Sequence, residues 1–207
     1  MSHPRRDFIK KLTVAAVGSG VLGTSLSLQA SSYKNYSIHS RPKLPKVKVS
    51  EDRVIKETVG LRPFRLSGPR IESQQLGNKT IVHNYGHGGS GWSLSWGTAL
   101  IASEMVQQTN VRQVGVMGCG VVGLATARTL QQKGYEVTIY TKDTYPNITS
   151  AMATGTWSPT SRLVHPSKVT PEFASMYQKA CTHSYKTFQR MLGLNQVVDW
   201  MDNYRIH

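Results

Sequence analysis

The sequence predicts an α/β fold, and three observations carry that prediction. Residues 113–117 are apolar and rich in strand-forming residues, a glycine-rich turn and an amphipathic run follow, and residues 136–140 alternate like a second strand. Upstream, a mostly apolar run from Ser93 onward (SLSWGTALIASEMV) favours a helix after a strand that ends at Ile81–Val82. Downstream, residues 173–192 favour another helix. Strands and helices therefore alternate along the chain, which is typical of the α/β class.

The first 30 residues have the pattern of an export leader. Arg5-Arg6 stand before Phe-Ile-Lys, and residues 12–30 carry no charge but are diluted by Gly, Ser and Thr. This pattern is typical of a twin-arginine signal. We therefore expect the twin-arginine export machinery as a partner and a periplasmic location, with a membrane anchor as the alternative if the leader is not cleaved. Residues 31–54 are polar, basic and Pro-containing, and are interpreted as a linker.

The net charge of +14, with a pI near 10.0, is concentrated in this leader and linker. Residues 1–56 hold 11 of the 25 Lys and Arg but only 3 of the 11 Asp and Glu. A nucleic-acid-binding protein more usually has a basic stripe with interleaved aromatic residues on its folded elements. The distribution of charge therefore argues against a nucleic-acid partner.

A glycine-rich turn, GCGVVG at residues 118–123, joins the first predicted strand to a helix that runs to about Lys133. Gly118 permits a tight turn, Gly120 lets the backbone approach a pyrophosphate, and Gly123 lets the helix pack closely on the strand. The first turn of the helix offers unpaired N–H groups and a positive dipole end. In this frame the turn predicts a Rossmann-like dinucleotide site.

The end of the second predicted strand does not select the dinucleotide. Thr141 and Lys142 occupy the places where a ribose-binding carboxylate is expected, and Asp143 follows them. Lys142 taken alone suggests the 2′-phosphate of NADP. The residues themselves leave FAD and NAD(P) open.

Four segments resemble the D-amino-acid oxidase family of flavoenzymes. They are VGLRPFR with PRIE (residues 59–72), HNYGHGGSGW (83–92), the glycine unit (114–140) and TSAMATGTWSP (149–159). The family has the glycine unit first and the HNYGHGG segment last, so the order here is circularly permuted.

The resemblance implies FAD as cofactor and an FAD-binding Rossmann-like domain with part of the family's substrate domain. After the signal at 1–30 and the linker at 31–54, it implies a segment of the family's C-terminal type at 55–109 and the FAD-binding segment with a helical region at 110–207. The joint is expected at Glu104 to Gln113. The family's active-site tyrosine and further sheet strands have no counterpart, so a missing polypeptide segment is expected.

The resemblance also implies the site residues. Arg62 pairs with the substrate carboxylate, a role suited to a planar guanidinium that makes two parallel charge-assisted bonds, and the Gly89 carbonyl accepts a bond from the substrate amine. The Thr149 and Ser150 hydroxyls meet phosphate or ribose oxygens, and the Ser93 hydroxyl points at the pyrimidine edge of the flavin. The expected cofactor-binding residues are Gly118, Gly120, Val121, Val122, Gly123, Lys142, Asp143, Thr149, Ser150, Met152, Gly155, Gly88, Ser90, Gly91, Trp92 and Ser93. Arg70 and Glu72, alternate residues on a strand, are interpreted as a paired face.

The implied activity is FAD-dependent oxidation of a D-amino acid to a 2-oxo acid, ammonia and hydrogen peroxide, with O2 as co-substrate. Three alternatives stay open: a related oxidase or dehydrogenase acting on glycine or N-methylated amino acids, an inactive exported flavin-binding fragment, and an NAD(P)-dependent dehydrogenase that rests on the glycine turn alone.

No metal site is expected. His83 and His87 are four residues apart in a glycine-rich segment without an evident third ligand, so they are interpreted as hydrogen-bonded structural histidines. Cys119 and Cys181 have no metal-type spacing and are expected to be free.

Overall fold

The computed structural model describes residues 46, 48–159, 163–193 and 197–201. The chain divides into two units, Met1–Arg53 and Val54–His207. In the first unit the described residues form a short 3-10 turn, η1 (Glu51–Arg53), where an Arg53 guanidinium nitrogen donates to the Lys48 carbonyl at 3.3 Å. The predicted leader and most of the predicted linker lie outside the described residues. Within those residues, no helix is both long enough and apolar enough to span a membrane.

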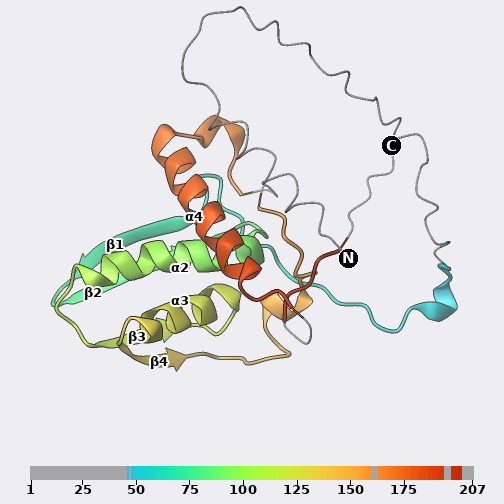
Figure 1. Ribbon diagram of the computed structural model, residues 1–207, viewed down its shortest axis with the longest axis horizontal. Helices are drawn as coiled ribbons and strands as arrows, with labels where there is room; N and C mark the ends of the chain where they lie inside the picture. The colour runs from blue at the N-terminus through green and yellow to red at the C-terminus, as the bar shows by residue number, and fades with distance from the viewer. Residues whose placement is uncertain (1–45, 47, 160–162, 194–196, 202–207) are drawn as a thin grey trace, which may run out of the picture. The chain divides into compact units, whose positions relative to one another are not determined.

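The second unit begins with an antiparallel hairpin of β1 (Arg70–Leu76) and β2 (Lys79–Tyr85) (Figure 1). The strand β2 runs three residues beyond the predicted end at Ile81–Val82, because the register continues until Arg70 lies opposite Tyr85. The prediction of that strand end was wrong because the ladder is set by the partner strand, which a local pattern does not contain.

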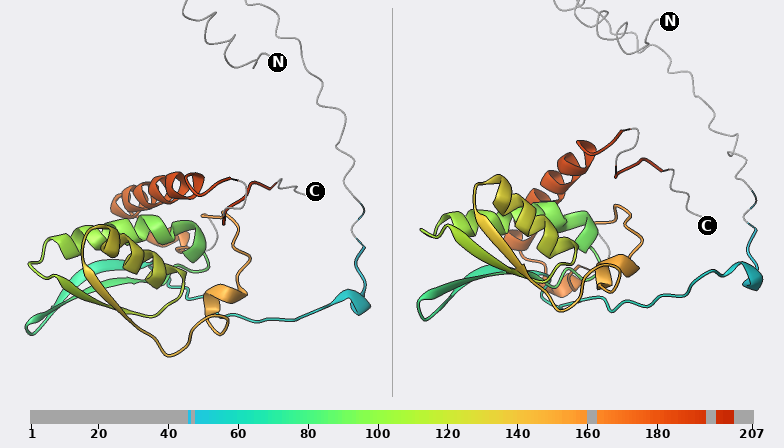
Figure 2. Two further views of the ribbon diagram at one scale, coloured as in Figure 1. Left: turned by 60° about the horizontal axis from the view of Figure 1, so that its bottom comes forward. Right: turned by 90° about the horizontal axis from the view of Figure 1, so that it is seen from below.

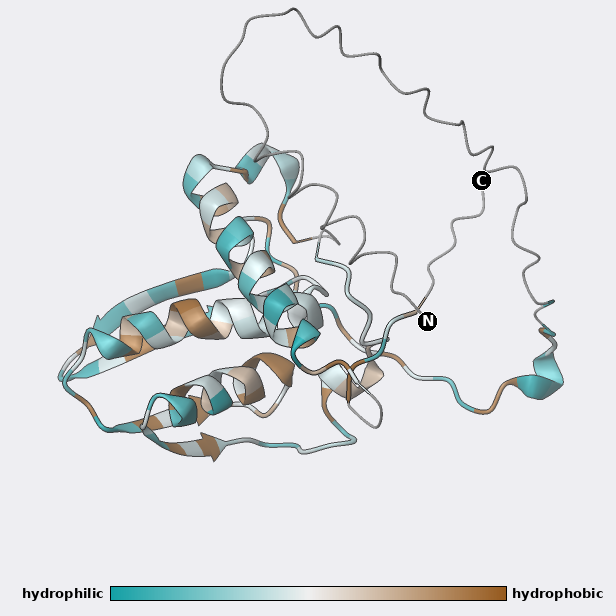
Figure 3. Ribbon diagram, in the orientation of Figure 1, coloured by the Kyte–Doolittle hydropathy of each residue, from teal (hydrophilic) through white to brown (hydrophobic). Residues whose placement is uncertain are grey.

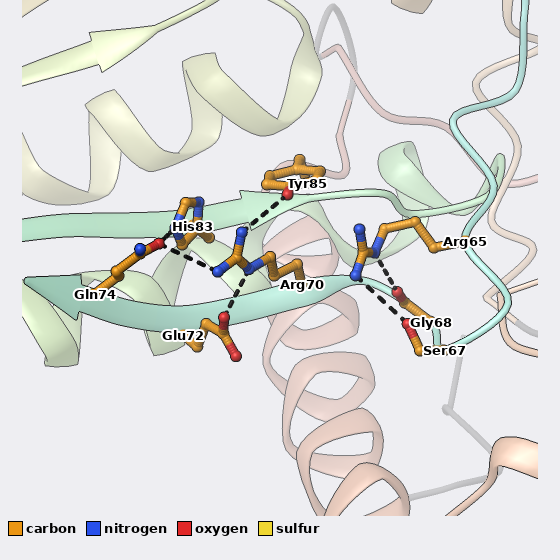
Figure 4. A network of polar contacts seen from close by, with 8 residues as sticks. All are labelled: Arg65, Ser67, Gly68, Arg70, Glu72, Gln74, His83 and Tyr85. Atoms are coloured by element: carbon orange, nitrogen blue, oxygen red, sulfur yellow. Dashed lines mark hydrogen bonds and ion pairs between the residues drawn. The ribbon is translucent and has the colours of Figure 1, made fainter.

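The exposed side of this hairpin carries a network of polar side chains (Figure 4). The Arg70 guanidinium contacts the Glu72 carboxylate at 2.6 Å and donates to the Gln74 side-chain oxygen at 3.3 Å and the Tyr85 hydroxyl at 3.4 Å. The prediction that Arg70 and Glu72 form a paired face is confirmed.

The helix α2 (Gly91–Gln107) lies between the hairpin and the helix α4 (Pro171–Gln189) (Figure 2). It begins two residues before the predicted start at Ser93. It also extends into the first part of the predicted joint at 104–113 and ends at Gln107, so the connection to the next strand is residues 108–112. One hydrophobic core forms under α2, built on Leu94, Ile101, Leu163 and Ala180.

The helices α2 and α4 cross at very short range. A Cβ built at Gly97 would collide with the Ala180 backbone, and the Gly97 N–H donates to the Ser184 hydroxyl at 2.7 Å. At its start α4 has Pro171 as its first helical residue and Thr170 as its cap, whose hydroxyl accepts from the Phe173 N–H at 3.2 Å. Figure 3 shows more hydrophilic residues along α4 than along α2, as expected for a helix with one exposed face.

The strand–helix–strand unit is observed as predicted. The strands β3 (Gln113–Met117) and β4 (Glu136–Tyr140) pair in parallel with Val114 opposite Val137, and α3 (Val121–Gln132) connects them. A second core forms between this unit and α2 from Val106, Val116, Ala127 and Leu130. The α/β class is confirmed, with two two-stranded sheets in the described part of the chain. The permuted order of the segments stays a prediction.

Candidate functional site

The segment around Arg62 packs against the loop between β2 and α2. The Gly88 N–H donates to the Pro63 carbonyl at 3.0 Å, and an Arg62 guanidinium nitrogen lies 3.5 Å from the Gly88 carbonyl. A Cβ built at Gly89 would collide with the Arg62 guanidinium, and Gly89 has φ of +101°, which strongly favours glycine. The structure therefore brings Arg62 and Gly89 together. Both residues are exposed.

The same loop is anchored to α2 by His87. This residue is only 2% exposed, and its Nε2 lies 3.0 Å from the Thr98 hydroxyl. Burial lowers the pKa of His87 to about 4, so the ring is neutral at neutral pH. His83 Nε2 lies 2.9 Å from the Gln74 side-chain oxygen. Both histidines are thus hydrogen-bonded, as predicted, and the described residues contain no group of three or more His, Cys, Asp and Glu suited to a metal.

The first turns of α2 and α3 meet at this place. A Cβ built at Gly91 would lie 3.6 Å from the side chains of both Val121 and Val122. Over these two first turns, which are fully described, the chain carries no acidic side chain. Two positive helix dipole ends therefore lie side by side, which favours a negatively charged ligand.

The glycine turn before α3 has the geometry of a phosphate-binding loop. Gly118 has φ of +96°, and its N–H donates to the Tyr140 carbonyl at 2.7 Å. A Cβ at Gly123 would collide with the Gly118 carbonyl oxygen, so helix and turn are in direct contact. The N–H groups of Val122 and Gly123 lie in the first turn, where an α-helix supplies no acceptor. A dinucleotide diphosphate fits this helix end.

The 3-10 turn η2 (Thr149–Met152) closes the other side of the same region. A Cβ at Gly60 would lie 3.1 Å from Met152 Cβ and 3.5 Å from the Thr149 methyl group, so the Arg62 segment passes beside this turn. The Ser150 hydroxyl accepts from the Val121 N–H at 2.9 Å. Ser150 therefore stands at the start of α3, next to the helix end suited to a diphosphate.

The Ser93 hydroxyl differs from its expected role at the flavin. Ser93 is 2% exposed, its Oγ accepts from the Ser158 N–H at 2.7 Å, and it donates to the Thr156 carbonyl at 3.5 Å. The reason is that the strand-like segment after η2 passes directly over the first turn of α2. This hydroxyl holds that segment instead of pointing into open space.

The residues after β4 are tied to the glycine turn. The Asp143 carbonyl accepts from the Cys119 thiol at 2.9 Å and from the Thr141 hydroxyl at 2.7 Å. Lys142 and Asp143 have exposed side chains, and Gly155 has φ of +72° with open space beside its Cα. The prediction of a free Cys119 is confirmed, but its thiol is a hydrogen-bond donor rather than only a small apolar group.

Several of the residues that hold these parts together were not predicted. They are Gly60, Gly97, Ser184 and the pair Asn84–Thr126, whose amide donates to the hydroxyl at 3.0 Å. One signal was available for the helix crossing, because Ala180 and Ser184 are small residues four apart in α4. The others join segments far apart in sequence and leave no local pattern.

Comparison with known proteins finds similarity to flavoenzymes. Residues 113–202 match the family model described as FAD dependent oxidoreductase. The chain is 52% identical over 52 residues to a D-amino-acid oxidase of Dictyostelium discoideum, a match that covers 24% of this chain and 15% of that protein. It is 42% identical over 62 residues to D-aspartate oxidase 1 of Caenorhabditis elegans, covering 28% of this chain and 19% of the relative. It is 45% identical over 58 residues to human D-aspartate oxidase, covering 26% and 17%.

These matches span less than a fifth of the length of each relative. No solved structure matches the chain. The family model covers β3, α3, β4 and α4, which include the glycine turn and the Ser150 segment. Residues 113–202 are thus similar to the FAD dependent oxidoreductase family, whose cofactor is FAD.

Proposed function

We propose that this chain supplies the FAD site and the substrate-carboxylate site of an oxidase that converts D-amino acids, O2 and water to 2-oxo acids, ammonia and hydrogen peroxide. The observation that carries the proposal is the contact between Arg62 and the Gly88–Gly89 loop, at the point where the first turns of α2 and α3 meet. A carboxylate-binding cation and a diphosphate-binding turn thus belong to one compact region.

The residues have separate tasks in this proposal. The first turn of α3 and the Ser150 segment hold the diphosphate, and the first turn of α2 directs its positive dipole end toward the flavin ring. Arg62 binds the substrate carboxylate through two charge-assisted hydrogen bonds, and the Gly89 carbonyl accepts a hydrogen bond from the substrate amine. FAD, when bound, supplies the hydride acceptor. The protein contributes orientation of the substrate.

The test uses the full 207-residue chain. We expect purified protein to carry flavin, with an absorbance band near roughly 450 nm, and to release peroxide with D-alanine or D-aspartate. Glycine and sarcosine are assayed in parallel, and peroxide release with either of them indicates a glycine-type or N-methyl amino-acid oxidase. Reduction of an artificial electron acceptor without peroxide release indicates a dehydrogenase. Protein that carries no flavin after reconstitution with FAD would end the proposal.

A second candidate is an exported flavin-binding protein without turnover. The exposure of Arg62 and Gly89 favours it. Water competes with a substrate carboxylate for an exposed guanidinium, which weakens substrate binding. Flavin binding without peroxide release, under every substrate tried, is the outcome that selects this candidate.

We also propose export through the twin-arginine route, on the strength of Arg5-Arg6 and the uncharged residues that follow. This route carries folded proteins, which suits an enzyme that takes up its cofactor before export. Substitution of both arginines by lysine should retain the protein in the cytoplasm, as measured by cell fractionation. Unchanged fractionation would contradict the proposal.

A further inference from the structure

Two of the hydrogen bonds that hold Ser150 come from two different helices. Its carbonyl accepts from the Trp92 indole N–H at 3.0 Å and also from the Ala153 N–H at 3.4 Å, and its hydroxyl accepts from the Val121 backbone N–H at 2.9 Å. Trp92 lies in the first turn of α2, and Val121 is the first residue of α3. Ser150 therefore connects the starts of two helices that are far apart in sequence.

The Trp92 bond is the one that acts on Ser150 from the side of α2. The neighbouring Ser93 hydroxyl holds the later part of the same segment, at Thr156 and Ser158. Gly60 lies against the opposite side of the turn, next to Met152. The segment is thus anchored at several points, and Trp92 is the α2 side chain that bonds to the residue capping α3.

This position has a chemical consequence for the Ser150 hydroxyl. A hydroxyl has two lone pairs and one proton, so an oxygen that accepts from a helix N–H still has a proton to donate. Donation from a fixed hydroxyl to an anion adds to the attraction of the helix end. The direction of that proton depends on how firmly the Ser150 backbone is held.

We propose that Trp92 is a positioning residue for the diphosphate site: its indole N–H fixes the Ser150 backbone, so that the Ser150 hydroxyl caps the first N–H of α3 and presents its proton to a diphosphate oxygen. The inference rests on the proposed binding of FAD. It assigns the indole of Trp92 a task that acts through Ser150 and needs no contact between the indole and the flavin.

The experiment measures FAD affinity of the full chain by titration calorimetry after removal of bound flavin. Trp92→Phe should weaken FAD binding about fivefold, which corresponds to about 1 kcal/mol. Trp200→Phe is the matched control, because it also removes an indole N–H but at a residue 64% exposed that contacts the Tyr185 ring. This control should bind FAD as the parent does. Equal affinities of Trp92→Phe and the parent would overturn the inference.

A double-variant cycle separates positioning from a general structural effect. Ser150→Ala should weaken FAD binding by a similar factor, and Trp92→Phe should then cost little more in the Ser150→Ala background. Amide hydrogen exchange at Val121 in the flavin-free protein should accelerate in both single variants and not in Trp200→Phe. Additive losses in the cycle, or an unchanged Val121 exchange rate, would overturn the inference.

Two further outcomes are decisive. If Trp92→Phe does not fold, the FAD affinity of Ser150→Ala still tests the inference. Parent-like FAD affinity in Ser150→Ala contradicts it. If the parent chain itself binds no FAD, the proposed function fails, whereas a parent that binds FAD and is unaffected by either substitution contradicts only the role of Trp92.

Discussion

The unit β3–α3–β4 and the region from Arg62 to α2 differ in the sequence separation of the residues that make their main contacts. In the first, the decisive contacts are local, such as that between Gly123 and Gly118. In the second they span long separations: Arg62 meets Gly88 from 26 residues away, and Trp92 meets Ser150 from 58. The difference teaches that the geometry of the glycine turn is determined by a short stretch of sequence, whereas the region from Arg62 to α2 depends on how distant segments dock.

The largest expected effect comes from adding a methyl group to the local unit. Gly123→Ala places a Cβ against the Gly118 carbonyl oxygen, so the turn or the helix must shift. We expect the free energy of unfolding to fall by about 3 kcal/mol and FAD binding to be lost. Chemical denaturation and flavin content measure the two effects.

Gly97→Ala is the control for this substitution. It creates a similar backbone clash, against Ala180, but at the crossing of α2 and α4. It should lower stability while the folded fraction retains FAD. Equal loss of FAD in both variants would show that FAD binding does not depend specifically on the local geometry of the glycine turn.

The next effect concerns the non-local side. Arg62→Met removes the guanidinium and leaves the glycine turn untouched, so flavin content should stay at the parent level. We expect kcat/KM for a D-amino acid to fall about 100-fold, equivalent to about 2.7 kcal/mol, because the substrate carboxylate loses its charged partner. Steady-state kinetics give the ratio. A variant with parent-like kcat/KM would exclude Arg62 as the carboxylate-binding residue.

The third prediction concerns pH. Burial lowers the pKa of His87 to about 4, so the unfolded chain takes up this proton more readily than the folded chain. The stabilising contribution is present above the unfolded pKa of about 6.5 and is lost as the pH falls toward 4. Between about pH 7 and pH 5 we expect a loss of about 2 kcal/mol.

Urea denaturation at the two pH values measures this loss. His87→Gln should reduce the pH dependence while His183, whose pKa is also lowered mainly by burial, still contributes in the same direction. An equally steep pH dependence in His87→Gln would assign the effect to other groups.

The smallest effect is expected at the exposed network on the hairpin. Arg70→Ala removes the contact with Glu72, which solvent and salt screen. We expect the melting temperature to change by no more than about 1 °C. A shift of several degrees, measured by circular dichroism, would mean that this network stabilises the hairpin register.

Much of the fold followed from local patterns. The strand–helix–strand unit was located by the alternation of apolar residues and by glycine, and α4 was expected as a helix over residues 173–192. The strand end at Tyr85 was missed because the ladder with Arg70 determines it, and the first part of the predicted joint is helical because α2 continues to Gln107. The task of the Ser93 hydroxyl was missed for the same reason, since its partners lie 63 and 65 residues away.

The sequence by itself determined the glycine turn and the helix after it, because steric limits and hydrophobic periodicity act over a few neighbouring residues. Only the tertiary structure decided which groups meet: Arg62 with the Gly88–Gly89 loop, and Trp92 with Ser150. These contacts arise when α2 packs on α3 and α4 and buries apolar surface, and that packing is a property of the whole unit rather than of any one segment.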